Sequence, residues 1–139
     1  MRIRFFPDQS DPLATAVQLI ERAYRSGRRV AVRIEPQLAP LLGRKLWEER
    51  PGVFLPNVMA DDSLAAATPI LLCLPEQQAP DERPVWVNLA RSLPETLPSC
   101  EWWFEVVGTG EADKGPARAR YRRYKALGYL VDVAKGGGT

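Results

Sequence analysis

The chain has 139 residues, of which 45% are hydrophobic and 26% are charged, and its formal net charge is +2. This size and composition predict one globular domain with a core of its own. No apolar run approaches the roughly 18 residues that a membrane span needs, which excludes a membrane-spanning class. The opening residues, MRIRFFPDQ, lack the layout of a secretory signal, so we expect a cytoplasmic protein.

The first elements in chain order read as strand, helix and strand. A strand is expected at Arg2–Phe6, followed by a helix with Asp11 as N-cap and Pro12 at its first position. Spacings of four, three and four give this helix an apolar stripe, formed by Leu13, Val17, Ile20 and Tyr24. Gly27 ends the helix, and the β-branched segment Arg28–Ile34 predicts the second strand. Such a strand–helix–strand unit favours a parallel sheet.

The middle of the chain alternates a helix, a loop and further strands. A helix is expected at Pro36–Glu48, with Pro40 marking the start of its regular part and Leu38, Leu42 and Leu46 on one face. Residues 50–68 are interrupted by proline and glycine and are expected to form a loop. Short strands are predicted at Pro69–Leu74 and Val85–Ala90, with an exposed loop at 75–83 between them.

The last part of the chain completes the pattern. Residues 93–101 are expected to be mostly turn, Trp102–Gly108 a strand, the basic segment after it a helix, and Tyr129–Val133 the final strand. Alternating strands and helices predict the α/β class: a single three-layer α/β/α domain over residues 1–134, with a mostly parallel sheet and Rossmann-like topology, a mixed sheet being left open. Residues 135–139 are expected to be a flexible tail.

Residues that usually carry catalysis or hold a cofactor are scarce. The chain has no histidine, so a histidine-based triad or general base is excluded. The turn after the first strand contains no glycine, and no phosphate-binding loop follows it. The two cysteines, Cys73 and Cys100, do not form a close pair and are expected to be structural. We therefore expect no cofactor, no metal and no enzymatic activity.

The strongest charge feature lies near the C-terminus. Residues 114–139 hold seven basic residues and one acidic residue, whereas residues 1–113 hold twelve basic and sixteen acidic ones. A helix capped by Asp113, with Pro116 at its third position, would turn Ala117, Tyr124 and Gly128 toward the sheet. Arg120 and Arg123 would then lie on one flank, and the other would carry Tyr121, Arg118, Arg122 and Lys125. That aromatic and cationic face predicts an anionic ligand, either single-stranded nucleic acid or an acidic peptide.

A second feature is apolar. Trp47 and Phe54 fall near a helix end and in a loop, where exposure is expected. They either fold back onto the sheet or form an apolar patch for a protein partner.

Five segments together resemble one known family, the chi subunit of bacterial DNA polymerase III. They occur in the family's order and spacing and cover most of the chain: Leu46–Asn57, Pro69–Glu76, Val85–Glu95, Phe104–Gly108 and Ala117–Tyr129. The resemblance implies an accessory protein of the clamp loader without catalysis of its own. It also implies two partners: the acidic C-terminal tail of single-stranded-DNA-binding protein, and the psi subunit or a helicase-like protein that competes with psi.

The resemblance also implies roles for individual residues. Arg118 would hold the terminal carboxylate of the tail, Tyr121 would line the pocket for its last aromatic side chain, and Arg122 would meet upstream acids; helix geometry adds Lys125. The psi-binding surface would be formed by Trp47, Phe54 and Pro56. DNA would be reached mainly through the partner protein. The alternative, a module that binds single-stranded nucleic acid directly, stays open.

This sequence departs from the family pattern at several positions. Asn57 stands where many members carry histidine, and Ala119 where an acid is common. Arg122 and Lys125 exchange their basic types relative to some members, which preserves charge but changes the hydrogen-bonding geometry.

Overall fold

The computed structural model describes residues 1–48 and 54–134. Within these residues the chain forms seven strands and three α-helices, in the order β1 Arg2–Gln9, α1 Pro12–Arg25, β2 Val30–Arg33, α2 Ala39–Glu48, β3 Asn57–Met59, β4 Ile70–Cys73, β5 Val85–Asn88, β6 Trp102–Gly108, α3 Glu111–Ala126 and β7 Leu130–Val133. A short 3-10 helix, Ala65–Ala67, lies between β3 and β4. None of the helices described is both long enough and apolar enough to cross a membrane.

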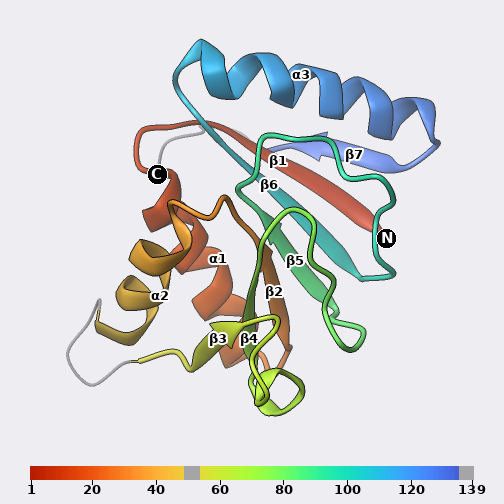
Figure 1. The fold of residues 1–139 in the computed structure, drawn as a ribbon. Coiled ribbons are helices and arrows are strands. Elements are labelled where there is room, and N and C mark those ends of the chain that lie inside the picture. The colour runs from red at the N-terminus through yellow and green to blue at the C-terminus, as the bar shows by residue number, and fades with distance from the viewer. Residues whose placement is uncertain (49–53, 135–139) are drawn as a thin grey trace.

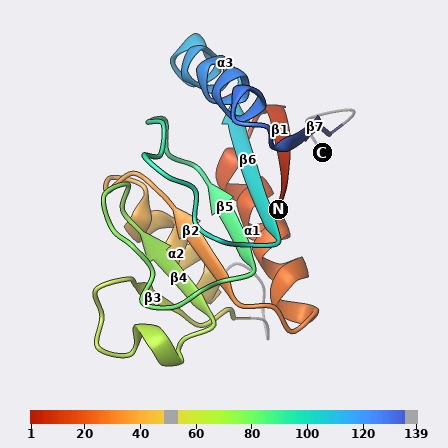
Figure 2. The same ribbon diagram turned by 90° about the vertical axis from the view of Figure 1, so that its right-hand side faces the viewer.

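The described strands form one sheet in the order β3-β4-β2-β5-β6-β1-β7, and every pair is parallel. Helices α1 and α2 cover one face and α3 covers the other (Figures 1 and 2). The predicted α/β fold is therefore confirmed, and the sheet is parallel rather than mixed. β1 and β2 are not neighbours, because β5 and β6 lie between them.

Helix α1 begins and ends at the residues that its sequence indicates. Oδ1 of Asp11 accepts a hydrogen bond from the Ala14 amide at 3.1 Å, and Pro12 occupies the first helical position. Gly27 adopts a positive φ of 83° directly after the helix, where a residue with a Cβ would be strained. The predicted stripe faces the core except at its end, since Tyr24 is 37% exposed.

The segment expected to be a loop at 50–68 contains a strand and a 3-10 turn. Asn57–Met59 pairs with β4 and forms one edge of the sheet. The side chain of Asn57 is buried and donates hydrogen bonds to the carbonyls of Leu55 and Gly43. The bond to Gly43 connects β3 to helix α2, which begins at Ala39, next to Pro40, where the regular part of the predicted helix starts.

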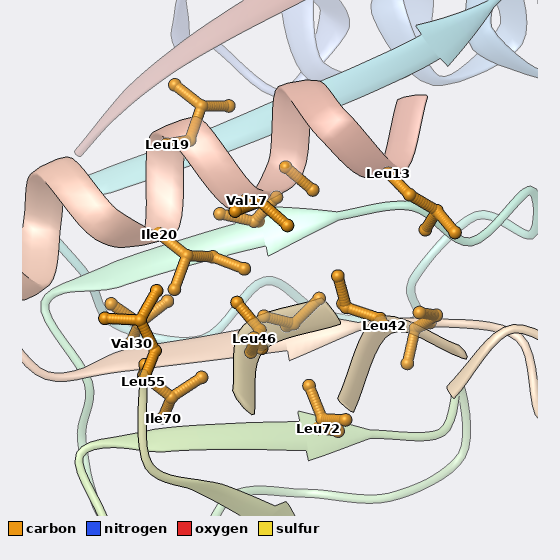
Figure 3. Close-up of a cluster of buried hydrophobic side chains, with 14 of the residues drawn as sticks. Leu13, Val17, Leu19, Ile20, Val30, Leu42, Leu46, Leu55, Ile70 and Leu72 are labelled. Carbon is orange, nitrogen blue, oxygen red and sulfur yellow. The ribbon is translucent and has the colours of Figure 1, made fainter. Parts of the chain in front are cut away.

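A hydrophobic cluster lies on each side of the sheet. The cluster under α1 and α2 takes side chains from both helices and from β2, β4 and β5; Figure 3 shows Leu46 and Leu55 among them. The cluster under α3 includes Phe5, Trp86, Trp103 and Tyr124. Cys73 is fully buried in this second cluster, as expected of a structural cysteine.

Candidate protein-docking surfaces

Helix α3 starts three residues earlier than its sequence suggested. Gly110 occupies the N-cap position without a side-chain hydrogen bond, so the predicted cap, Asp113, lies inside the first turn. Pro116 is consequently inside the helix and not at its third position. Asp113 instead pairs with Arg91 at 2.8 Å, and a carboxylate in the first turn is favoured by the helix dipole.

The buried side of α3 is built from Ala117, Arg120 and Tyr124. Placing Arg120 on the flank with Arg123 was wrong, because Arg120 is only 3% exposed while Arg123 is exposed. The spacing of three and four residues sets Arg120 between Ala117 and Tyr124 on the same face. A basic side chain is tolerated on this buried face because it forms an ion pair with Glu105 of β6.

Glu105 is fully buried and its carboxylate accepts four hydrogen bonds. The donors are Asn88 Nδ2 at 2.8 Å, Trp103 Nε1 at 2.9 Å, Arg120 Nε at 3.1 Å and Tyr124 Oη at 2.7 Å. Burial, and then the adjacent negative charge of Glu105, raise the pKa of Tyr124. These bonds fix α3 on the sheet and thereby fix the orientation of its exposed face.

The exposed side of α3 brings some of the predicted residues into contact. Tyr121 is half-buried and packs edge-to-face against Phe5, with ring centroids 5.5 Å apart. Nζ of Lys125 lies 5.7 Å from the centre of the Tyr121 ring, which is within cation–π range. Arg122 is exposed and forms no ion pair within the described residues. Tyr121 therefore presents an aromatic surface beside cationic groups.

Arg118 already holds a carboxylate. Its Nη1 lies 3.2 Å from Oε2 of Glu111, and Nη2 lies 3.4 Å from Oε1. Both side chains are exposed, at 57% and 77%. The hydrogen bond from Arg118, followed by its charge, lowers the pKa of Glu111. The guanidinium is thus arranged to bind a carboxylate with two hydrogen bonds, and water can reach the pair.

Trp47 and Phe54 form a second exposed feature on the other side of the sheet. Their rings stack 5.5 Å apart with 15° between the planes, and they are 45% and 58% exposed. The residues next to them, Leu46 and Leu55, are buried and joined by a backbone hydrogen bond from the Leu55 amide to the Leu46 carbonyl. Of the two expectations for this pair, folding back onto the sheet is wrong. Pro56 is half-buried and leads from Leu55 into β3.

Comparison with known proteins supports one family. The model of the family described as "DNA polymerase III chi subunit, HolC" matches residues 1–132. The chain belongs to the DNA polymerase III chi subunit family. Three proteins named DNA polymerase III subunit chi are similar to it, from Pseudomonas aeruginosa (32% identical, covering 88% of this chain and 84% of that protein), Haemophilus influenzae (25%, 85% and 83%) and Escherichia coli (24%, 89% and 88%).

Membership of the chi family gives the chain a place in DNA replication, as a subunit of DNA polymerase III. Within residues 1–48 and 54–134, no group of three or more histidine, cysteine or acidic residues could hold a metal ion. What this chi-family structure does offer is two exposed surfaces on opposite faces of one sheet: the basic side of α3 and the Trp47–Phe54 stack.

Glu105 was not among the predicted site residues of this chi-family chain. One signal for it exists in the sequence, since Glu105 is a single acidic residue within the apolar strand Trp102–Gly108. A charged residue at a core position requires a partner, and α3 supplies one. The loop residue Arg91 was also missed, although its backbone carbonyl accepts a hydrogen bond from Arg120 at 2.7 Å.

Proposed function

We propose that this chi-family chain is a non-catalytic adaptor of the replication machinery. It binds the acidic C-terminal tail of single-stranded-DNA-binding protein through α3, and it binds the psi subunit of the clamp loader through the Trp47–Phe54 stack. The observation that carries the first part is the Arg118–Glu111 pair, because it presents an exposed guanidinium in a geometry that accepts a carboxylate.

The tail site is formed by four residues of α3: Arg118, Tyr121, Arg122 and Lys125. Arg118 exchanges Glu111 for the terminal carboxylate of the tail. Packing against Phe5 holds the half-buried ring of Tyr121 in one orientation. The exposed part of this ring contacts the last aromatic side chain of the tail. Arg122 and Lys125 attract the acidic residues upstream.

The psi surface is formed by Trp47, Phe54 and Pro56. Stacked rings with about half of their area exposed form an apolar contact of the kind that anchors protein interfaces. The same surface would serve a helicase-like protein that competes with psi. Since α3 covers the opposite face of the sheet, the adaptor can hold the tail and psi together.

Titration with a peptide ending in acidic residues, proline and phenylalanine tests the tail site. Arg118→Ala should weaken binding by about tenfold or more, because it removes a charge-assisted pair. Arg123→Ala is the matched control, since Arg123 is an exposed arginine of α3 outside the four-residue site, and should bind as the wild type does. Equal losses in both variants would show general charge attraction instead of a site.

Direct binding of single-stranded nucleic acid is the alternative function, favoured by the basic C-terminal segment and by Arg122, which has no ion-pair partner in the described part of the chain. It requires tight binding of oligo-dT by the isolated protein, with a steep dependence on salt. We expect only weak binding at physiological salt, because the net charge of the chain is +2.

A further inference from the structure

A groove on the α3 side of the sheet belongs to neither proposed surface. Its volume is about 620 Å³, within the range of ligand-binding clefts. The loop between β4 and β5 forms one wall, and the loop between β5 and β6 forms the other; Figure 2 shows these loops in green and teal. Trp86 and Trp103 lie at its floor, and none of the four proposed tail-binding residues lines it.

The walls are held by interactions inside the protein. Arg83, in the loop between β4 and β5, is 1% exposed and donates hydrogen bonds to the carbonyls of Ala65, Thr68 and Pro69. These bonds attach the first wall to the segment that precedes β4. Arg33 donates to the carbonyl and the hydroxyl of Ser92, both at 2.8 Å, which anchors the second. Three prolines further restrict the backbone of the walls, at Pro75, Pro94 and Pro98. The groove is therefore preformed.

The floor carries a hydrogen-bond donor without an acceptor. Trp86 and Trp103 stack with centroids 5.7 Å apart, but their indole N–H groups differ. Trp103 donates to Glu105 at 2.9 Å, whereas Nε1 of Trp86 is buried and has no partner among the described residues. Trp86 is only 6% exposed, and a buried unpaired donor is unfavourable. Trp86 lines the groove, so a small shift of its side chain on binding would bring this N–H to an acceptor on the ligand.

The rim of the groove is acidic. Glu76, Glu82 and Glu95 are exposed and form no ion pair within the described residues. Asp81 is different, because Arg29 at 2.6 Å and Arg83 at 2.8 Å neutralise it. The two buried cations at the groove are also engaged, Arg33 by Ser92 and Asn88, and Arg83 by Asp81 and by backbone carbonyls. The charge that a ligand meets at the rim is therefore negative.

We propose that this groove binds an extended, basic peptide segment of a partner protein. A peptide carbonyl accepts the Trp86 N–H, and lysine or arginine side chains pair with the three rim glutamates. A basic peptide suits both the unpaired Trp86 N–H and the acidic rim. An anion would be repelled by the rim glutamates, and a small polycation has no acceptor for the indole N–H. The groove is separate from the tail and psi sites, so this proposal does not depend on either of them. The groove favours a basic ligand, whereas the basic side of α3 favours an acidic one.

Nuclear magnetic resonance of the indole N–H groups tests the proposal on the whole chain. The probe is a decapeptide of alternating proline and lysine, which stays extended, and the comparison probes are the proline–glutamate decapeptide and spermine. The signal of Trp86 is assigned by its loss in Trp86→Phe. The proline–lysine peptide should shift this signal downfield and saturate, while the Trp47 signal should stay in place.

Charge variants supply the second readout and keep the fold intact. E76Q/E82Q/E95Q should bind the proline–lysine peptide about tenfold more weakly. The matched control E48Q/D61N/D62N also removes three exposed acids, none of which lines the groove, and should change nothing. The proposal is overturned if the Trp86 signal does not move, if the proline–glutamate peptide binds equally, if the triple variant binds like wild type, or if spermine produces the same indole shift.

Discussion

Nε of Arg120 on α3 lies 3.1 Å from Oε1 of Glu105 on β6, and both residues are buried, with 3% of Arg120 and 0% of Glu105 exposed. A buried charge is tolerated only when it is paired and hydrogen-bonded. Here the side chains of Asn88, Trp103 and Tyr124 donate the other three hydrogen bonds to the Glu105 carboxylate. The basic helix is therefore attached to the sheet by its own buried arginine, while its other arginines are directed to solvent.

Removing Glu105 should destabilise the protein strongly. Glu105→Ala leaves Arg120 as an uncompensated buried charge, and such a loss costs about 3–5 kcal/mol. Urea unfolding measures the free energy. E105L/R120M removes the uncompensated charge and should recover part of the loss, while Asn88, Trp103 and Tyr124 still lose their common acceptor. The exposed Arg118→Ala should change stability little. A double variant as unstable as Glu105→Ala would contradict the assigned pairing.

Glu111 should compete with the tail for Arg118. Glu111→Gln removes the internal carboxylate, so we expect the acidic peptide to bind a few-fold more tightly. Anisotropy of a labelled peptide measures this change. Glu48→Gln is the control, since it removes an exposed acid from α2 instead of α3. Unchanged affinity in Glu111→Gln would show that Arg118 is not the group that receives the carboxylate.

Asp81 should contribute stability that depends on pH. Partial burial opposes its ionisation, but Arg83 and Arg29 outweigh burial and lower its pKa below the ordinary value of 3.8. Because the unfolded chain binds the proton at higher pH than the folded one, the contribution is complete above about pH 4 and is lost as the pH falls through the lowered pKa. The difference in free energy of unfolding between wild type and Asp81→Asn should therefore shrink from pH 7 to pH 3, as measured by urea unfolding at each pH. A difference that stays constant from pH 7 to pH 3 would contradict the pairing of Asp81 with the two arginines.

Both cysteines should react slowly in the folded protein. Burial raises the pKa of Cys73 to about 12 and that of Cys100 to about 11, so little thiolate exists at pH 8. We expect alkylation of Cys100 about a hundredfold slower than that of a free cysteine, and alkylation of Cys73 slower still because it is fully buried. Mass spectrometry after iodoacetamide treatment measures both rates, with denatured protein as the fully labelled control. Rapid labelling of the native chain would contradict the burial.

The sequence predicted the elements better than their arrangement. Periodicity and capping located α1 and most strands, because those signals are local, as at Asp11 and Gly27. It missed β3, since three residues between Pro56 and an acidic loop carry no usable period. It also misplaced Arg120, because arginine is usually exposed and its partner Glu105 is 15 residues away. Strand order depends on such non-local contacts and could not be read from the pattern.

For the candidate surfaces, the sequence indicated the residues but not their contacts. It suggested Trp47 and Phe54 as a pair without showing that they stack. It placed Tyr121 among the cations of α3, yet the pairing of Arg118 with Glu111 needed the geometry of two helical turns. The groove over Trp86 was not predicted, because its walls come from two loops without a repeating pattern.

The most direct test of the adaptor account compares one acidic tail peptide in two forms. The peptide ends in proline and phenylalanine, with a free carboxylate in the first form and a C-terminal amide in the second. Calorimetry with the wild-type chain should give binding that weakens by about tenfold or more on amidation, and Arg118→Ala should bind both forms equally weakly. If amidation leaves the wild-type affinity unchanged, Arg118 does not hold a terminal carboxylate and the proposed tail site is wrong.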